Sequence, residues 1–171
     1  MEIVIILGLI FLNGILSMSE IAMVSARKSR LETAAKKGSK TAKTALRLAN
    51  EPDRFLSTIQ IGITLIGILT GLYSGEALAG DLARWLETIG IPQAHSLTLA
   101  KGIIVILVTY LTLILGELVP KHLGMNAPEK IARLIARPME VLSKIASPFV
   151  WLLSASTQAV IRLTGLHTST E

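Results

Sequence analysis

The stretch IVIILGLIFLNGILSMSEIAMV, residues 3–24, decides the fold. As a helix rising about 1.5 Å per residue, it is long enough to cross a hydrocarbon core of about 30 Å. Two further apolar runs, residues 55–74 and 99–119, have a similar length. The run 55–74 contains no charged residue. We therefore predict an all-α membrane protein with three transmembrane helices, folded as a single domain over residues 1–171.

The composition supports this class. Hydrophobic residues make up 51% of the chain and charged residues only 17%, whereas soluble proteins average about 25% charged residues. The mean hydropathy is +0.59. The first run follows Glu2 rather than a basic segment, and it is longer than the apolar part of a signal peptide. We interpret it as a retained helix.

The polar segments between the runs predict the orientation. Nine lysines and arginines against three acids lie between Ser25 and Arg54. Their apolar neighbours recur at helical spacing up to Glu51-Pro52-Asp53, which predicts a basic helix over residues 25–54 on an anionic leaflet. Residues 75–96 contain three acids, Glu76, Asp81 and Glu87, against one basic residue, Arg84, with turn markers at Gly90 and Pro92. By the positive-inside rule the basic segment is cytoplasmic and the N-terminus lies outside.

The C-terminal third permits two interpretations. Residues 127–137 are basic and amphipathic, and residues 138–163 are apolar but contain Pro148, Glu140 and Lys144. A fourth crossing is one interpretation. We favour juxtamembrane helices at the interface with lipid, because a charge at the bilayer centre costs a few kcal/mol. The tail 164–171 resembles a cut rather than a natural domain end.

Each predicted span carries a stripe of small or polar residues on one face. Ordinary packing of membrane helices explains such stripes equally well, because small residues allow close approach. With about 3.6 residues per turn, Ser19 lies off the stripe of the first span unless the helix is distorted near Gly14. The stripes comprise Asn13, Ser17 and Glu20; then Ser57, Gln60, Thr64, Gly67 and Gly71; then Thr109, Thr112 and Gly116.

Two carboxylates make the stripes chemically informative. Glu20 and Glu117, with hydroxyl, amide and carbonyl oxygens, form an oxygen donor set that suits Mg²⁺, Ca²⁺ or Na⁺ rather than zinc or copper. Pro120 is expected to break the third helix and to free carbonyl groups for a cation. The alternatives are an interfacial position for Glu20 and an i,i+4 ion pair between Glu117 and Lys121.

Other function classes find little support in the sequence. There is no cysteine, the three histidines show no ligand spacing, and no nucleophile elbow or phosphate-binding glycine loop is present. We expect neither an enzyme nor a nucleic-acid partner, because the positive charge lies beside a span and few aromatic residues could stack on bases. Membrane lipid is the expected partner of the basic segment.

Three motifs resemble the CNNM/CorC family of magnesium transporters. They are NGILSMSEIA at residues 13–22, QIGITL at residues 60–65 and GELVPK at residues 116–121, the last being the most specific. The resemblance implies a homodimer and a magnesium site enclosed by the three helices. It also implies ATP-binding cytoplasmic CBS domains after the membrane domain, and we expect this chain to be the membrane domain alone.

Carried over residue by residue, the resemblance points to Ser17 and Glu117 as the best-matched cation ligands, with Gly62 as a carbonyl donor. Gly67 departs from the family, in which many members have asparagine. Asn13 or Gln60 could replace that amide. The full candidate set is Ser17, Glu117, Gly62, Glu20, Asn13, Ser19 and Gln60, with Pro120, Lys121 and Gly67 as further positions of interest.

The leading functional hypothesis is secondary transport of Mg²⁺ across the inner membrane. The resemblance favours efflux, with possible exchange for Na⁺. The rival hypothesis is a membrane anchor that senses Mg²⁺, regulates a partner and transports nothing.

Overall fold

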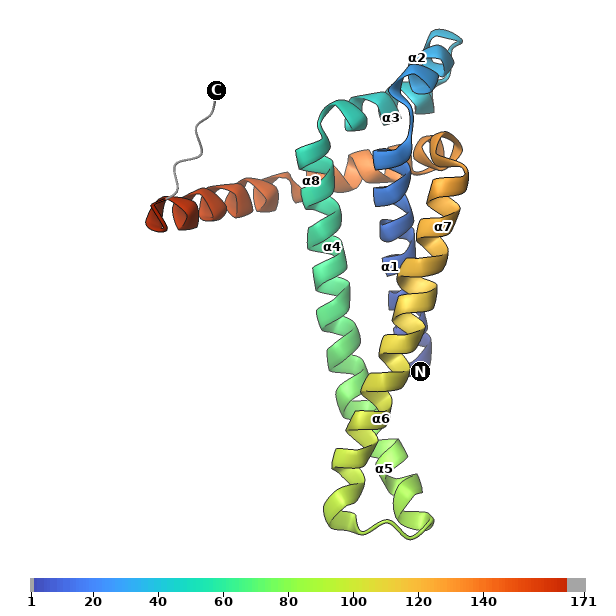
Figure 1. Cartoon of the computed structure of the whole chain (residues 1–171), viewed down its shortest axis with the longest axis vertical. Helices are drawn as coiled ribbons and strands as arrows, with labels where there is room; N and C mark the ends of the chain where they lie inside the picture. Colours follow the sequence, from blue (N-terminus) through green and yellow to red (C-terminus); the bar gives the residue numbers. More distant parts are fainter. Residues whose placement is uncertain (1, 166–171) are drawn as a thin grey trace.

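Residues 2–165 are described by the structure, a computed structural model, and this part of the chain contains helices and no strand. Three long helices lie side by side as a bundle (Figure 1). In chain order the elements are α1 Glu2–Ser25, α2 Lys28–Lys36, α3 Lys40–Asn50, α4 Pro52–Tyr73, the π-helical turn η1 Ser74–Leu78, α5 Ala79–Thr88, α6 Gln93–Leu113, the π-helical turn η2 Ile114–Leu118, α7 Val119–Asn126 and α8 Pro128–Leu163.

The bundle confirms the predicted all-α membrane fold. Helices α1 and α4 and the continuous helical segment Gln93–Asn126 are long and apolar enough to cross a bilayer. The helical segment Gln93–Asn126 extends beyond both limits of the predicted third span, 99–119. Helix also continues past Pro120, which was expected to break it. The π-helical turn η2 directly before Pro120 accommodates the proline and lets the helix go on.

The basic segment forms two helices instead of the single one predicted. Helices α2 and α3 are separated by Gly38, whose φ of +98° is a left-handed conformation that favours glycine. Ser39 caps α3 by accepting a hydrogen bond from the backbone N–H of Ala42 at 3.2 Å. The predicted stop at Glu51-Pro52-Asp53 is confirmed, since α3 ends at Asn50 and Pro52 opens α4.

The acidic segment at the other end of the bundle is a helical hairpin. Helix α5 packs against α6, with Ala79, Ala83 and Leu86 buried against Ala100 and Ile104. The turn lies at Gly90, whose φ is +103°, as the turn markers predicted.

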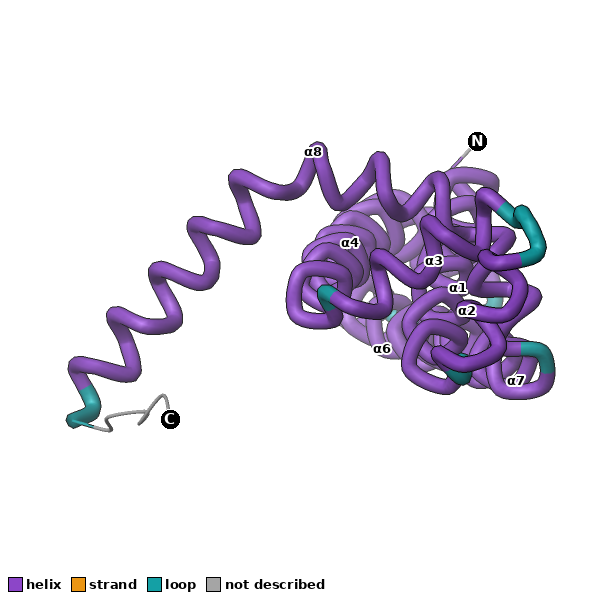
Figure 2. The backbone as a smooth tube through the Cα atoms, turned by 90° about the horizontal axis from the view of Figure 1, so that it is seen from above, coloured by secondary structure: helices purple, strands orange, loops and turns teal. Residues whose placement is uncertain are grey.

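The C-terminal third is one helix, α8, which is continuous through Pro138 and Pro148. Figures 1 and 2 show it running across one end of the bundle and then leaving it. Its first half buries Ala132, Ile135, Ala136 and Met139 in the core shared by α1, α3 and α4. All residues from 151 to 160 are exposed. This arrangement agrees with the juxtamembrane interpretation rather than a fourth crossing. Residues 166–171, most of the predicted tail, lie outside the described part.

Glu129 joins the start of α8 to the start of α2. Its Oε1 accepts a hydrogen bond from the backbone N–H of Arg27 at 3.2 Å and lies 3.9 Å from Nη1 of Arg30. Burial alone would raise the pKa of Glu129. The hydrogen bonds from the backbone N–H groups of Glu129 and Arg27, together with the charges of Arg30 and Arg27, outweigh burial and lower that pKa.

We predict that Glu129→Gln destabilises the protein at neutral pH by about 1 kcal/mol, because an amide oxygen accepts these hydrogen bonds less strongly and lacks the charge favoured at a helix N-terminus. A carboxylate with a lowered folded-state pKa stabilises fully above its unfolded-state pKa and loses this effect as the pH falls through the folded-state value. The difference in melting temperature from the wild type, measured in detergent, should therefore shrink below about pH 4.5. The matched control is Glu32→Gln, which changes an exposed acid on α2; an equal loss there would contradict the assignment.

Candidate functional site

The distinctive local feature is the backbone carbonyl of Gly116, four residues before Pro120. In an α-helix the N–H of residue 120 would bond the carbonyl of Gly116, but proline has no N–H. Asn13 of α1 supplies the missing donor, because its Nδ2 donates to the carbonyl oxygen of Gly116 at 3.1 Å in a buried position. The carbonyl that a proline at position 120 deprives of its α-helical donor thus accepts a hydrogen bond from a side chain of another helix.

Glycines allow α1 to approach the third helix this closely. A Cβ atom added at Gly14 would lie 2.9 Å from the carbonyl oxygen of Leu115 and 3.1 Å from Cγ of Pro120. One added at Gly116 would lie 2.9 Å from Nδ2 of Asn13. Further along, a Cβ at Gly124 would come within 2.9 Å of the carbonyl oxygen of Met18. These glycines are explained by packing between α1 and the segment η2–α7.

The three stripes meet in part around a cavity of about 290 Å³ between α1, α4 and α6. Asn13 lines it from α1, Gly67 and Gly71 from α4, and Thr109 and Thr112 from α6. A Cβ added at Gly67 or Gly71 would meet no atom within 4 Å. Packing inside the protomer therefore does not require glycine at these two positions, and the asparagine that many family members have at position 67 would have room here.

Two hydroxyl residues of this cavity, Thr70 and Ser74, are absent from the predicted stripes. Both are buried, and their hydroxyl groups donate to the carbonyls of Ile66 at 2.7 Å and Gly71 at 3.3 Å. Ser74 lies three residues beyond Gly71, so extending the stripe by one turn would have found it.

Ser17 and the two carboxylates differ in burial. Ser17, one turn beyond Asn13, is buried, whereas Glu20 and Glu117 are half-buried. Glu117 belongs to the π-helical turn and directly follows Gly116. No ion pair among residues 2–165 involves Glu20, Glu117 or Lys121. The alternative pairing of Glu117 with Lys121 is therefore not formed.

Three other candidates stand apart. The hydroxyl of Ser19 donates to the carbonyl of Ile15 at 2.6 Å, a bond within its own helix. Gln60 is exposed, and its Nε2 donates to the hydroxyl of Thr64 at 3.3 Å. A Cβ at Gly62 would lie 2.7 Å from Cδ1 of Leu16, so this glycine makes room for a leucine.

The candidate site contains few charged groups that could bind a metal ion. In the described part of the chain, no three Asp, Glu, His or Cys side chains gather closely enough to hold a metal ion. Any cation at this site would therefore be held by isolated carboxylates together with neutral hydroxyl, amide and carbonyl oxygens. Such a set suits a hard cation that keeps part of its hydration shell.

Comparison with known proteins identifies the family. Residues 4–171 match the family described as CNNM, Cyclin M transmembrane N-terminal domain. The chain belongs to this CNNM family. It is 48% identical over 166 residues to UPF0053 protein sll0260 of Synechocystis, 32% identical over 163 residues to UPF0053 protein YhdT of Bacillus subtilis, and 30% identical over 162 residues to the polyamine export protein of Escherichia coli K12.

The match covers 97%, 95% and 95% of this CNNM domain, respectively, but 37%, 35% and 36% of those relatives. The chain thus spans about a third of the length of the curated relatives that it matches.

We predict that Asn13→Leu destabilises this CNNM domain by about 1–3 kcal/mol, because it leaves the buried carbonyl of Gly116 without its donor. Pro120→Ala returns a backbone N–H at the position that can bond that carbonyl. The Asn13→Leu/Pro120→Ala double variant should therefore lose at least about 0.5 kcal/mol less than the sum of the two single losses. Thermal melts of the three variants in one detergent measure this coupling, and strictly additive losses would contradict it.

Proposed function

We propose that this CNNM domain carries cations across the membrane and that Mg²⁺ is its cargo, moved outward in possible exchange for Na⁺. The observation that carries the proposal is Glu117, a half-buried carboxylate in a predicted span with no ion-pair partner among the described residues. A carboxylate at membrane depth is costly without a compensating charge, and a transported cation provides one.

The surroundings of Glu117 support a cation pathway. It lies in the π-helical turn η2, where the regular α-helical hydrogen-bond pattern is interrupted, and interrupted helices serve ion sites in other transporters. Asn13 uses its Nδ2 for Gly116, which leaves its Oδ1 as an oxygen donor beside the cavity. Ser17, one turn away, adds a hydroxyl oxygen.

A polyamine is the second candidate cargo, because one relative that is 30% identical is named a polyamine export protein. An organic polycation needs carboxylates for its amines and apolar contact for its methylene groups. The cavity offers the apolar contact through Ile10, Ile66, Val105 and Val108, whereas its described lining residues include no carboxylate.

The rival function from another class is a magnesium-sensing membrane anchor without flux. It would use the same carboxylates and would need no pathway to the opposite side. Measurements of binding and flux on the same reconstituted protein separate the two functions.

We also propose that the domain lies in the bacterial inner membrane with its N-terminus outside. The basic helices α2 and α3 and the start of α8 gather at one end of the bundle, and the hairpin containing α5 lies at the other (Figure 1). The positive-inside rule places the basic end in the cytoplasm.

For the transport proposal, we predict that Glu117→Gln abolishes Mg²⁺ binding and flux and leaves the melting temperature within a few degrees of the wild type. The amide keeps the shape of the side chain but removes the charge that offsets dehydration of the ion. Calorimetric titration, a thermal melt and Mg²⁺ flux into liposomes provide the measurements, with Glu32→Gln as the control for loss of an exposed acid.

The outcomes of this test are distinct. Mg²⁺ binding by the wild type without any flux would favour the sensing anchor. Flux of spermidine that excludes Mg²⁺ would favour the polyamine. Unchanged Mg²⁺ affinity in Glu117→Gln with a large fall in melting temperature would contradict the role given to Glu117.

A homodimer is part of the proposal. One protomer has too few spans to surround a pathway, and the cavity-lining residues Gly67, Gly71 and Thr109 are exposed in the single chain. A second copy would cover this face.

We predict that Thr109→Cys forms a covalent dimer under mild oxidation in membranes. The chain has no natural cysteine, so the introduced thiol is the sole reactive one. Leu107→Cys, an exposed position on the same helix pointing elsewhere, is the matched control. Monomer alone from Thr109→Cys, or equal cross-linking at both positions, would contradict an interface on this face.

A further inference from the structure

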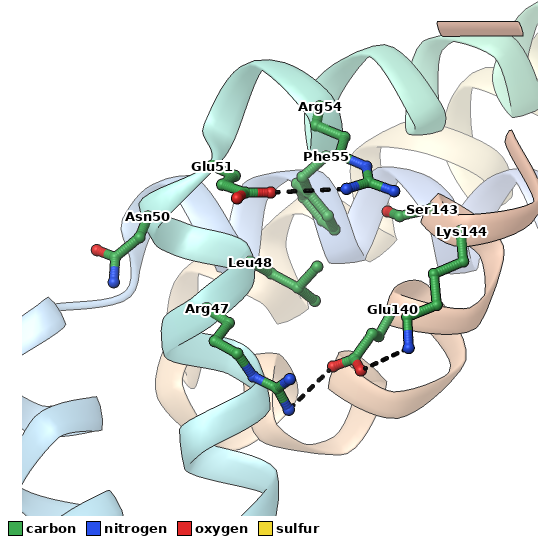
Figure 3. Close-up of a pocket in the computed structure, with 9 residues that line it drawn as sticks. All are labelled: Arg47, Leu48, Asn50, Glu51, Arg54, Phe55, Glu140, Ser143 and Lys144. Atoms are coloured by element: carbon green, nitrogen blue, oxygen red, sulfur yellow. Dashed lines mark ion pairs between the residues drawn. The ribbon is translucent and has the colours of Figure 1, made fainter. Parts of the chain in front are cut away.

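A second cavity, of about 280 Å³, lies at the basic end of the bundle. It is formed by α3, the start of α4 and the middle of α8 (Figure 3). Neither the cation site nor the proposed pathway includes it. Its lining combines the cationic side chains of Arg47, Arg54 and Lys144 with apolar Leu48 and Phe55.

Ser143 gives this cavity an unsatisfied donor. The residue is 4% exposed, and its Oγ is a buried polar atom with no hydrogen-bond partner among the described residues. Figure 3 shows the hydroxyl directed into the space beside Phe55 and Arg54. Burial of a hydroxyl without a partner is unfavourable, so a bound acceptor at this point would remove that cost.

The charge balance of the cavity favours an anion. Glu140 forms ion pairs with two cationic side chains, with Nη2 of Arg47 at 3.3 Å and with Nζ of Lys144 at 3.5 Å. Arg54 lies 3.9 Å from Glu51, a carboxylate that is largely exposed. An adjoining cavity shares Arg47 and Glu140 and adds Lys40, Lys43 and Arg137. The two cavities together present six cationic side chains against two carboxylates.

The position of the cavity favours a lipid as the source of that anion. The apolar stretch of α4 begins at Phe55, which forms a wall of the cavity. A headgroup held here would leave its acyl chains beside a helix that enters the bilayer. The N-terminal end of α4, with Pro52 in its first turn, adds a partial positive charge.

We propose that this cavity binds the phosphodiester headgroup of an acidic phospholipid in the leaflet on the basic side of the membrane. Arg54 and Lys144 hold the phosphate, and the hydroxyl of Ser143 donates to one of its oxygens. The bound headgroup bridges α3, α4 and α8 at the last well-packed stretch of α8 before its exposed half. It thereby fixes the direction in which α8 leaves the bundle. The proposal does not depend on which cation the domain moves.

Native mass spectrometry of the detergent-solubilised chain tests this proposal with short-chain phosphatidylglycerol and phosphatidylcholine of equal chain length. We expect phosphatidylglycerol to bind the wild type at least about tenfold more tightly, as expected for charge-assisted hydrogen bonds to phosphate. Ser143→Ala and the Arg54→Gln/Lys144→Gln variant should each weaken it about fivefold or more. Ser143→Ala should keep or raise the lipid-free melting temperature, because the buried hydroxyl has no partner to lose.

The matched control is Lys130→Gln/Arg133→Gln, which removes the same charge from α8 outside this cavity. It should bind phosphatidylglycerol like the wild type. Equal binding of the two lipids, an equal loss in the control, or wild-type affinity in Ser143→Ala would overturn the site. Displacement of phosphatidylglycerol by an equal concentration of free glycerol phosphate would overturn the assignment to a lipid.

Discussion

Every backbone polar group inside a bilayer must find its partner within the protein, and Pro120 makes this demand specific. The proline deprives the carbonyl of Gly116 of its helical donor, and Asn13 replaces that donor at 3.1 Å. A side chain can reach a backbone atom of another helix only when the two helices nearly touch. The hydrogen bond therefore explains why Gly14 and Gly116 face one another, and it fixes which side of α1 meets the third helix.

The contact between α1 and the third helix explains some of the small residues but not others. An added Cβ would collide with a backbone oxygen at Gly14 and Gly124 and with the amide of Asn13 at Gly116, so close approach explains these glycines. Gly67 and Gly71 have open space beside them, and they line the cavity that Asn13 also borders. Their lack of a side chain preserves that space instead of permitting a contact. The polar face of α4 is thus the part of the stripes that packing inside the protomer leaves unexplained.

The features that depend on local composition, such as the spans, could be predicted from the sequence. The contacts between residues far apart in the chain could not. Hydropathy predicted α1 and α4, because a run of about 20 apolar residues has the length needed to cross a bilayer. The expected break at Pro120 failed because a π-helical turn costs less in lipid than a broken helix with several open carbonyls. The division at Gly38 was hidden by apolar spacing that continues on both sides of it. The bond between Asn13 and Gly116, like the pairing of Glu140 with Arg47, joins distant residues that no local pattern connects.

The surroundings of Glu140 change the reason for expecting α8 to lie at the membrane surface. Its charge argued against a crossing by α8 because an isolated carboxylate is expensive in lipid, yet in the fold it lies between Arg47 and Lys144. Pairing lowers that cost, so the charge of Glu140 alone no longer excludes a crossing. The stronger argument is positional. Arg47 belongs to α3, which carries exposed lysines, and the ion pair between Arg47 and Glu140 holds this part of α8 at the level of α3. Figure 1 shows α8 running across the end of the bundle, which is the direction expected of a helix that lies at the membrane surface.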